Sequence, residues 1–404
     1  MSTSSGAETK VTVGPDRHSS EQKIDWRRLF GLREMGVYYA LLLLIAVLAV
    51  VTSSMGRENY LSVLNLTNVL YQSSLIAIMA VAMTVVLISG NFDLSVASVA
   101  AFSAVLLIGN ADALGYWPAI ALAMAAAIGL GLLNGVIVQY VGINAFIVTL
   151  GTMTAVRGLI LIYTDGRSLS VSDPEIIEAM KAFEGGRYDV GWLILALGIV
   201  LLVLGAFGAV RSRNARKSLS PTHIGLVLGG FLFLAISAIT DATLELRNPV
   251  IYLIIFTSIV WFTLTFTMVG RRLYAVGGNP EAARLSGINV TRYKLLAFVF
   301  CSGTAGFSGI LFASRLRSIN PSALTAAELT VIAAAILGGT SLFGGAGSVI
   351  KTLAGALLLY SLTNGFNILN LGANYQGFVE GVVVVAAAAI YTVGSKRAKS
   401  KTGG

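Results

Sequence analysis

The chain has 404 residues, of which 56% are hydrophobic and only 12% are charged, and its formal net charge at pH 7 is +9. This balance excludes an ordinary soluble globular domain and indicates a polytopic membrane protein. With one cysteine and two histidines, the chain has no intrachain disulfide and no plausible clustered metal site, and we expect neither a bound metal nor a nucleic-acid partner.

The apolar residues are gathered in blocks long enough to cross a bilayer. Residues 1–34 are rich in Ser, Gly and charge and are predicted to be a disordered cytoplasmic tail, with a second cytoplasmic tail at 395–404. Twelve blocks can be distinguished, at 37–54, 70–89, 94–109, 118–140, 144–163, 191–210, 223–240, 250–269, 295–313, 326–343, 348–366 and 377–394. Because several are short and interrupted by glycine, above all 94–109 and 326–343, we predict an all-α helical bundle of about 10–12 transmembrane helices over residues 35–394.

The basic residues indicate how this bundle is oriented. With the N-terminus inside, 20 of the 28 Lys and Arg residues fall in inside segments and 7 in outside segments, and Arg157 lies within a span. Such an excess of positive charge is typical of the cytoplasmic side. We therefore predict that both termini and the polar stretch at 271–294 are cytoplasmic.

A weak internal repeat relates the two ends of the bundle. Five Asn and Gly residues between Asn134 and Gly151 recur as the same residue types 230 positions later, and the blocks of 70–163 fall onto those of 295–394. In the predicted topology the first block of one half enters from outside and that of the other from inside. This pattern favours the inverted repeat found in transporters, with chance identity in a glycine-rich chain as the alternative.

Several polar side chains lie within or at the edges of the apolar blocks, where an ionisable group is costly unless it pairs or lines water. In SGNFDLSVAS at 89–98, Gly90 and Asn91 can interrupt a helix and Asp93 can cap the next one. Candidates for a translocation path are Asn91, Asp93, Ser95, Asn134, Asn144, Thr149, Glu328 and Asn364. The alternative is structural: Asp93 only caps a helix, and Arg157 pairs with a carboxylate that holds the bundle together.

The stretch 271–294, RRLYAVGGNPEAARLSGINVTRYK, separates two apolar blocks and carries five basic residues. Its middle predicts a short helix, because Asn279 can cap it, Pro280 suits the first helical position and Glu281 favours the positive end of the helix dipole. Gly287 then supplies a left-handed stop. A loop held only by its own caps is the alternative to a functional helix.

This helix has no apolar face wide enough to build a core, and Ala282 and Ala283 leave its backbone open to another protein. The segment GRRLYAVGGNPEAARLSGINV at 270–290 resembles, nearly residue for residue, the cytoplasmic loop of the permease subunits of bacterial sugar ABC importers of the ribose, arabinose, galactose and xylose type. SGNFDLSVAS is similar to the Gly-Gly-Ile-Asp-Leu-Ser-Val-Gly-Ser signature of that family, with Asn91 and Ala97 replacing two glycines.

The resemblance implies the transmembrane subunit of an ATP-driven, binding-protein-dependent sugar importer in the bacterial inner membrane, working as a homodimer by alternating access. The chain would be no enzyme and would bind no cofactor, because a separate cytoplasmic subunit would use ATP and Mg. That ATPase is expected to dock on Gly278, Asn279, Pro280, Glu281, Ala282, Ala283, Arg284, Leu285, Ser286 and Gly287.

On the outer side the resemblance implies a periplasmic sugar-binding protein. The longest outer segment, 165–190, carries six acidic and three basic side chains and is otherwise an ordinary solvated loop. Candidate contacts for the binding protein are Glu175, Glu178, Arg315 and Arg317. The AARLSGINV match, the extra apolar pair at 191–240 and the chain length look most like the xylose-type permeases, which favours a pentose and xylose in particular.

The glycine-rich stretch at 337–352, LGGTSLFGGAGSVIKT, ends in the Lys-Thr pair of a phosphate-binding loop, but Ile350 stands where that motif requires Gly. We therefore expect helix packing and a tight turn there, not an ATP site. The rival function is a secondary sugar transporter driven by an ion gradient. It would need protonatable carboxylates in the membrane, for which Asp93, Glu328 and Glu380 are available.

Overall fold

The computed structural model describes residues 32–214, 221–240 and 243–371, together with five positions, Gly377, Phe378, Gly381, Val382 and Val385. Contacts within the chain separate Met1–Gly36 from Val37–Gly404, and the architecture below is that of the second unit. The predicted tail at 395–404, most of the tail at 1–34, Glu380, and all but those five positions of the span at 377–394 lie outside the described residues.

Helices dominate the described residues, and the protein is an all-α polytopic membrane protein, as predicted. Nine of the described helices are long and apolar enough to cross a bilayer. They are α2 (Leu32–Ser54), α3 (Val63–Ile88), α4 (Val96–Leu114), α5 (Tyr116–Val136) with its π-helical continuation η1 (Ile137–Val141), α6 (Ala145–Thr164), α8 (Gly191–Asn214), α10 (Asn248–Phe266), α13 (Val290–Leu316) and α15 (Val349–Leu369).

Two further apolar helices are α9 (Pro221–Ile239) and α14 (Ala327–Leu337). The predicted span at 94–109 is confirmed as the helix α4, but the predicted span at 326–343 is wrong. With 11 residues, α14 is about 16 Å long at 1.5 Å per residue, roughly half the thickness of a hydrocarbon core of about 30 Å. The helix ends because Gly338 and Gly339 follow it, the second with φ of 78°, and a glycine-rich loop continues to Ser348.

The remaining elements are short. They are the helices α7 (Pro174–Gly185), α11 (Met268–Gly278) and α12 (Pro280–Leu285), and four strands. The strands β1 (Leu169–Ser170) and β4 (Ser318–Ile319) form one antiparallel ribbon, in which Leu169 faces Ile319. The strands β2 (Arg187–Asp189) and β3 (Glu245–Arg247) form the other, in which Tyr188 faces Leu246.

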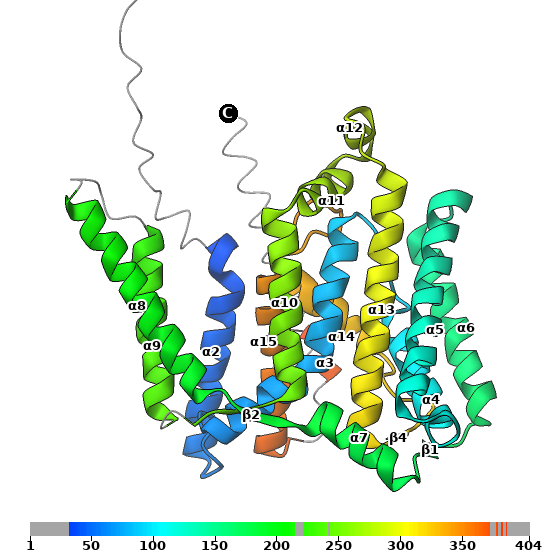
Figure 1. Cartoon of the computed structure of the whole chain (residues 1–404), viewed down its shortest axis with the longest axis horizontal. Helices are drawn as coiled ribbons and strands as arrows, with labels where there is room; N and C mark the ends of the chain where they lie inside the picture. Colours follow the sequence, from blue (N-terminus) through cyan, green and yellow to red (C-terminus); the bar gives the residue numbers. More distant parts are fainter. Residues whose placement is uncertain are drawn as a thin grey trace, which may run out of the picture. The chain divides into compact units, whose positions relative to one another are not determined.

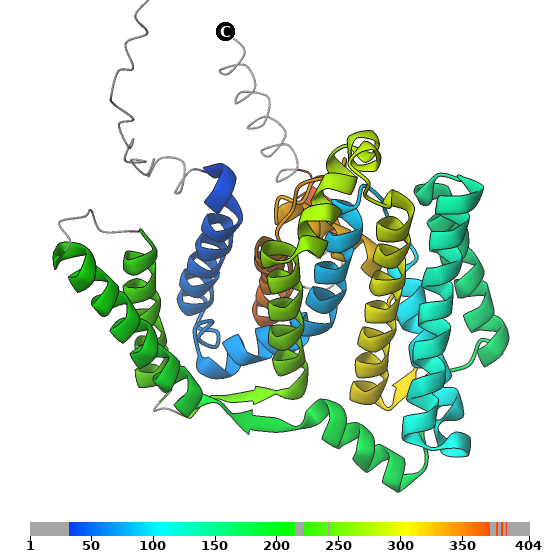
Figure 2. The same cartoon turned by 45° about the horizontal axis from the view of Figure 1, so that its top comes forward.

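The core is built around α3. From Ala77 to Ile88 every residue of this helix is buried, and Ile78, Met79 and Met83 are among the largest side chains without solvent exposure. Helices α10, α13, α14 and α15 pack against it, and Figure 2 shows α3 among them. Such a helix, apolar on all sides, suits a position inside a bundle. The helices α8 and α9 instead pack mainly on each other.

The two ends of the helices carry different elements (Figure 1). One end carries α11, α12 and the end of α8, and the other carries α7 and both ribbons. The helices α3 and α13 run in opposite directions, since Tyr71 near the start of α3 accepts a hydrogen bond from Arg315 at the end of α13. Each is followed by a non-helical segment and then by a shorter helix, α4 or α14. This arrangement fits an inverted repeat, which stays a prediction.

Candidate functional site

The segment α11–α12 stands at the end of the described helices (Figure 1). The side chain of Asn279 accepts hydrogen bonds from the backbone nitrogens of Glu281 at 3.1 Å and Ala282 at 3.0 Å. Pro280 occupies the first helical position, and Gly287 has φ of 77° just beyond the helix. The predicted start and stop of this helix are therefore confirmed, and each has the physical cause expected from the sequence.

One expectation about α12 is wrong. The sequence predicted that Ala283 leaves the helix backbone open to a partner, but Ala283 is buried in a small core with Val276 and Val290. This contact fixes α12 on α11 and α13, whereas Ala282 remains exposed. Leu285 is 91% exposed, so the tip of α12 presents a large apolar side chain that nothing in the described chain covers.

Three separate segments meet at one backbone crossing beneath α12. The backbone nitrogen of Gly345 donates to the carbonyl oxygen of Ile88 at 2.9 Å, which joins the glycine-rich loop to the end of α3. Gly277 lies against the same carbonyl so closely that any Cβ would overlap it. The hydroxyl of Tyr274 donates to the Gly347 carbonyl at 2.8 Å, and burial raises the pKa of this phenol above its ordinary value. The end of α11, which leads into α12, is therefore in direct backbone contact with the end of α3.

Three of the predicted path residues lie together where α4 begins. The side chain of Asp93 accepts hydrogen bonds from the nitrogen of Ser95 at 2.9 Å and from its hydroxyl at 2.5 Å. The amide of Asn134 on α5 donates to that hydroxyl at 3.0 Å, and Thr152 on α6 donates to the Asn134 oxygen at 2.6 Å. Asp93, Ser95 and Asn134 are all fully buried, and one carboxylate oxygen of Asp93 has no partner. These residues form a polar ladder across α4, α5 and α6.

The other path candidates are dispersed. Asn91 contacts Ser89, Asn144 caps α6 by accepting from Phe146, and the Thr149 hydroxyl donates to the Ala145 carbonyl within its own helix.

Asn364 on α15 donates to the Asn65 oxygen on α3 at 3.0 Å. Buried polar atoms without a partner include one oxygen each of Glu328 and Asn364, so both residues keep unused hydrogen-bonding capacity.

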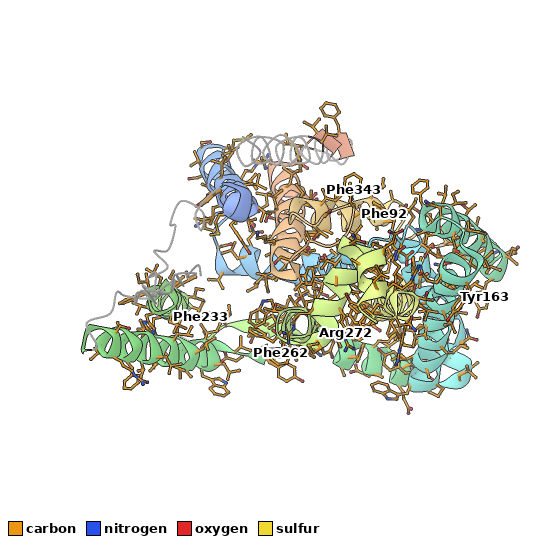
Figure 3. The ribbon with its side chains drawn as sticks, turned by 90° about the horizontal axis from the view of Figure 1, so that it is seen from above. Phe92, Tyr163, Phe233, Phe262, Arg272 and Phe343 are labelled. Atoms are coloured by element: carbon orange, nitrogen blue, oxygen red, sulfur yellow. The ribbon has the colours of Figure 1, made fainter. Side chains whose placement is uncertain are left out.

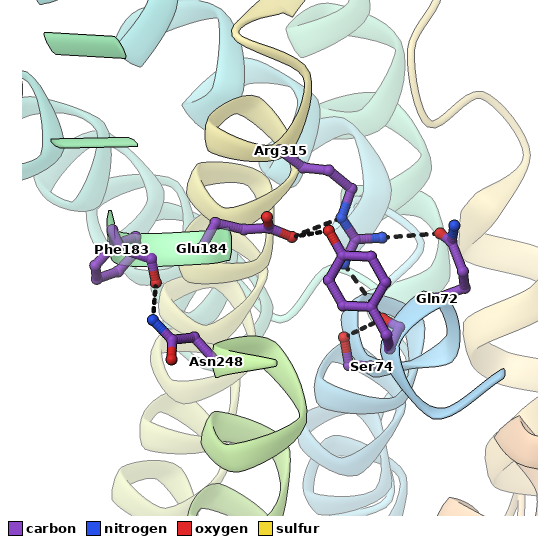
Figure 4. Close-up of polar contacts among 7 residues, drawn as sticks. Gln72, Ser74, Phe183, Glu184, Asn248 and Arg315 are labelled. Atoms are coloured by element: carbon purple, nitrogen blue, oxygen red, sulfur yellow. Dashed lines mark hydrogen bonds and ion pairs between the residues drawn. The ribbon is translucent and has the colours of Figure 1, made fainter. Parts of the chain in front are cut away.

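At the end of the helices opposite to α12, a charged cluster that the sequence did not reveal joins α7 to α3 and α13 (Figure 4). Glu184 on α7 accepts from the Arg315 guanidinium and from the Tyr71 hydroxyl, both at 2.7 Å. Arg315 also donates to Gln72 and to the Tyr71 carbonyl. The guanidinium carbons of Arg315 and Arg247 lie 3.9 Å and 4.2 Å from the centre of the Tyr71 ring.

The expectations about two arginines also change. Arg315 was a candidate for the binding-protein contact. Its guanidinium instead pairs with Glu184 inside this cluster, and its side chain is only 14% exposed. Arg157 was expected to pair with a carboxylate, and Glu328 does interact with it electrostatically, but its hydrogen bonds go to the backbone carbonyls of Ala323 at 2.6 Å and Leu324 at 2.8 Å. Leu324 and Ala326 have φ of 56° and 64°, so Arg157 secures a turn in a conformation unusual for residues other than glycine.

The remaining outer candidates are exposed. Glu175 and Glu178 lie on the solvent side of α7, whose other face buries Ile176 and Met180. Glu178 pairs with Lys181 at 3.1 Å, and Arg317 ends α13 with a left-handed conformation. An amphipathic spacing of apolar residues in α7 was the available signal for this helix, whereas the pairing of Glu184 with Arg315 crosses 131 positions and leaves no local signal.

Comparison with known proteins shows which proteins this chain resembles. Residues 65–388 match the family described as branched-chain amino acid transport system / permease component. The chain is similar to the ribose import permease protein RbsC of Escherichia coli (strain K12), with 35% identity over 91% of this chain and 97% of the relative. It is also similar to the xylose transport system permease protein XylH of the same organism, with 36% identity over 81% and 84% of the two chains. No solved structure matches.

Proposed function

This chain belongs to the permeases of ABC sugar importers of the ribose and xylose type, and from that premise we propose that it carries a pentose inward across the bacterial inner membrane as one copy of a homodimer. The identities of 35% to a ribose permease and 36% to a xylose permease carry the proposal. Ribose and xylose permeases resemble the chain to nearly the same degree, so the proposed substrate class is a pentose. Xylose, which the sequence favoured, and ribose are distinguished by which sugar stimulates ATP hydrolysis in the assembled importer.

We propose that a cytoplasmic ATPase docks on residues 278–287. Three observations support this role: α12 stands at the end of the helices, it is fixed from below by Ala283, and it exposes Leu285. The excess of Lys and Arg in the segments at this end supports a cytoplasmic position for it and for both termini. The backbone crossing at Gly277 provides the route by which ATP-driven movement reaches α3.

Replacing Leu285 by glutamate should remove the ATPase from the purified permease. The side chain is 91% exposed, so the folded permease loses no packing, whereas an apolar contact with the partner would gain a desolvated charge. We expect at least a tenfold loss of co-purified ATPase, measured by affinity capture, with unchanged membrane insertion. Leu285→Met keeps an apolar side chain of similar size and should retain the ATPase. Normal capture with Leu285→Glu would refute docking at this residue.

We propose that sugar passes between the two copies, along surfaces that carry polar hydrogen-bonding groups. The unpartnered oxygens of Glu328 and Asn364 and the Asn65–Asn364 pair support a path beside α14 and α15. These groups suit sugar hydroxyls, because a buried polar atom without a partner gains a hydrogen bond when a hydroxyl approaches. The exposed acidic face of α7, with Glu175 and Glu178, and Arg317 are proposed contacts for a periplasmic binding protein.

Substitution of Asp93 distinguishes the proposed ATP-driven import from transport driven by an ion gradient. It is fully buried and has one oxygen without a partner, as a proton-binding carboxyl could have. Asparagine keeps the oxygen that accepts from Ser95 but cannot be ionised. We therefore expect Asp93→Asn to keep ATP-dependent uptake within about threefold of the wild-type rate, a cost of under about 1 kcal/mol. Uptake reduced a hundredfold by Asp93→Asn, while Asn134→Asp behaves normally, would favour the ion-gradient mechanism.

A further inference from the structure

A basic cavity of about 720 Å³ lies beside α12 but not on it. Its walls come from the start of α11, from the connection between α12 and α13, and from the first two turns of α13. Three arginines, Arg271, Arg272 and Arg292, line it, and no acidic side chain does. No residue of Pro280–Leu285 is part of the wall, but Ser286 and Gly287 are, so the cavity adjoins the end of the proposed docking segment without including the helix α12 itself.

The three guanidinium groups have no counter-charge in the part of the chain that the structure describes. None of the ion pairs found among those residues involves Arg271, Arg272 or Arg292. The start of α13 adds to the positive potential, because Asn289, which caps this helix, also lines the cavity at the positive end of the helix dipole. Three like charges around one cavity repel one another, and an anion placed between them would relieve that repulsion.

The rim of the cavity is apolar and lies where two candidate membrane-spanning helices have their ends. Met268, Val269 and Leu296 line it and are 53%, 51% and 49% exposed. Two of the helices that are apolar enough to cross the bilayer end here, α10 at Phe266 and α13 at Val290. Phe262 and Phe266 near the end of α10 are exposed as well, and Arg272 and Phe262 lie on the same edge when the helices are seen from above (Figure 3).

We propose that this cavity binds the headgroup of an anionic glycerophospholipid. The arginines would hold the phosphate through paired N–H···O hydrogen bonds, for which the planar guanidinium is suited. The acyl chains would descend over Met268, Val269 and Leu296 into the hydrocarbon region. This combination of basic groups above exposed apolar groups fits a lipid better than the acidic surface of a partner protein, which would leave the apolar rim against charge. A bound lipid would brace α11 against α13 beside the docking helix.

The experiment uses the full chain purified in a neutral detergent, with native mass spectrometry to count bound lipid. The probes are dioleoyl phosphatidylglycerol, dioleoyl phosphatidylcholine and inorganic phosphate. The test variant combines Arg271→Gln, Arg272→Gln and Arg292→Gln, which lie at exposed positions where substitution is expected to leave the fold intact. The control combines Lys396→Gln, Arg397→Gln and Lys399→Gln, which removes the same charge from the C-terminal segment.

We expect the wild-type chain and the control to bind phosphatidylglycerol at least tenfold more tightly than phosphatidylcholine, and the test variant to lose this preference. A preference that survives in the test variant would overturn the proposal. So would displacement of phosphatidylglycerol by millimolar inorganic phosphate, which would indicate a site for a small anion. Loss of the ATPase from the test variant with lipid binding unchanged would assign the arginines to the partner protein instead. None of these outcomes depends on which sugar is transported.

Discussion

Replacing Gly277 by alanine should uncouple the permease from its ATPase while leaving it in the membrane. The added methyl group would overlap the Ile88 carbonyl oxygen and lie 2.8 Å from the Gly345 nitrogen, so α11 must move away from α3 and the glycine-rich loop. Overpacking of a tight contact costs about 1–3 kcal/mol. Because we propose this contact as the route from α12 into the bundle, we expect at least a tenfold loss of sugar-stimulated ATP hydrolysis in the assembled importer.

A glycine outside the crossing and outside residues 278–287 provides the control. A Cβ on Gly129 in α5 would meet nothing within 4 Å. Gly129→Ala adds the same methyl group to a helix, and we expect hydrolysis within about twofold of wild type, or under about 0.5 kcal/mol. Equal activity of the two variants would mean that the crossing at Gly277 does not transmit the movement.

Arg315→Ala should be the most destabilising single substitution at the opposite end. Glu184 is only 5% exposed at its side chain, and the change would leave its carboxylate buried without the guanidinium, 2.7 Å away. Removing one partner of a buried ion pair typically costs about 3–5 kcal/mol. Loss of the contact with the Tyr71 ring adds to this cost. The measurement is the thermal unfolding temperature of the purified chain in detergent.

Arg317→Ala is the control, because this arginine is exposed two residues further along and has no described ion pair. We expect its unfolding temperature to match that of the wild type. The double substitution Arg315→Met with Glu184→Leu should recover much of the lost stability, since apolar side chains of similar size can replace a buried pair. If Arg315→Ala unfolds at the wild-type temperature, the cluster does not hold α7 to α3 and α13.

Features that depend on residues close together in the sequence could be predicted, whereas features that depend on distant residues could not. The caps of α12 lie within a few residues of the helix, and both Asn279 and Gly287 act as expected. The burial of Ala283 depends on Val276 and Val290, which reach it only through the folded path of the chain. A helix of six residues therefore has a small core that its own composition does not indicate.

Among the candidate site residues, too, contacts between sequence neighbours could be predicted and contacts between distant residues could not. Asp93 and Ser95 are two residues apart, and their contact follows from the capping chemistry of the sequence. Arg157 bonds to carbonyls 166 and 167 positions away, which every residue carries, so no residue type could identify that partner. The span predicted at 326–343 failed because hydropathy does not register where a glycine pair ends a helix.

The central claim is that this chain is the membrane subunit of an importer driven by ATP. The most direct test reconstitutes it with a cytoplasmic ATPase and a periplasmic pentose-binding protein in sealed proteoliposomes and follows the movement of labelled xylose and ribose. We predict that transport requires ATP on the side of α12 and all three proteins, and that it continues when the proton and sodium gradients are dissipated. Transport by the chain alone that follows an imposed ion gradient and ignores ATP would contradict the claim.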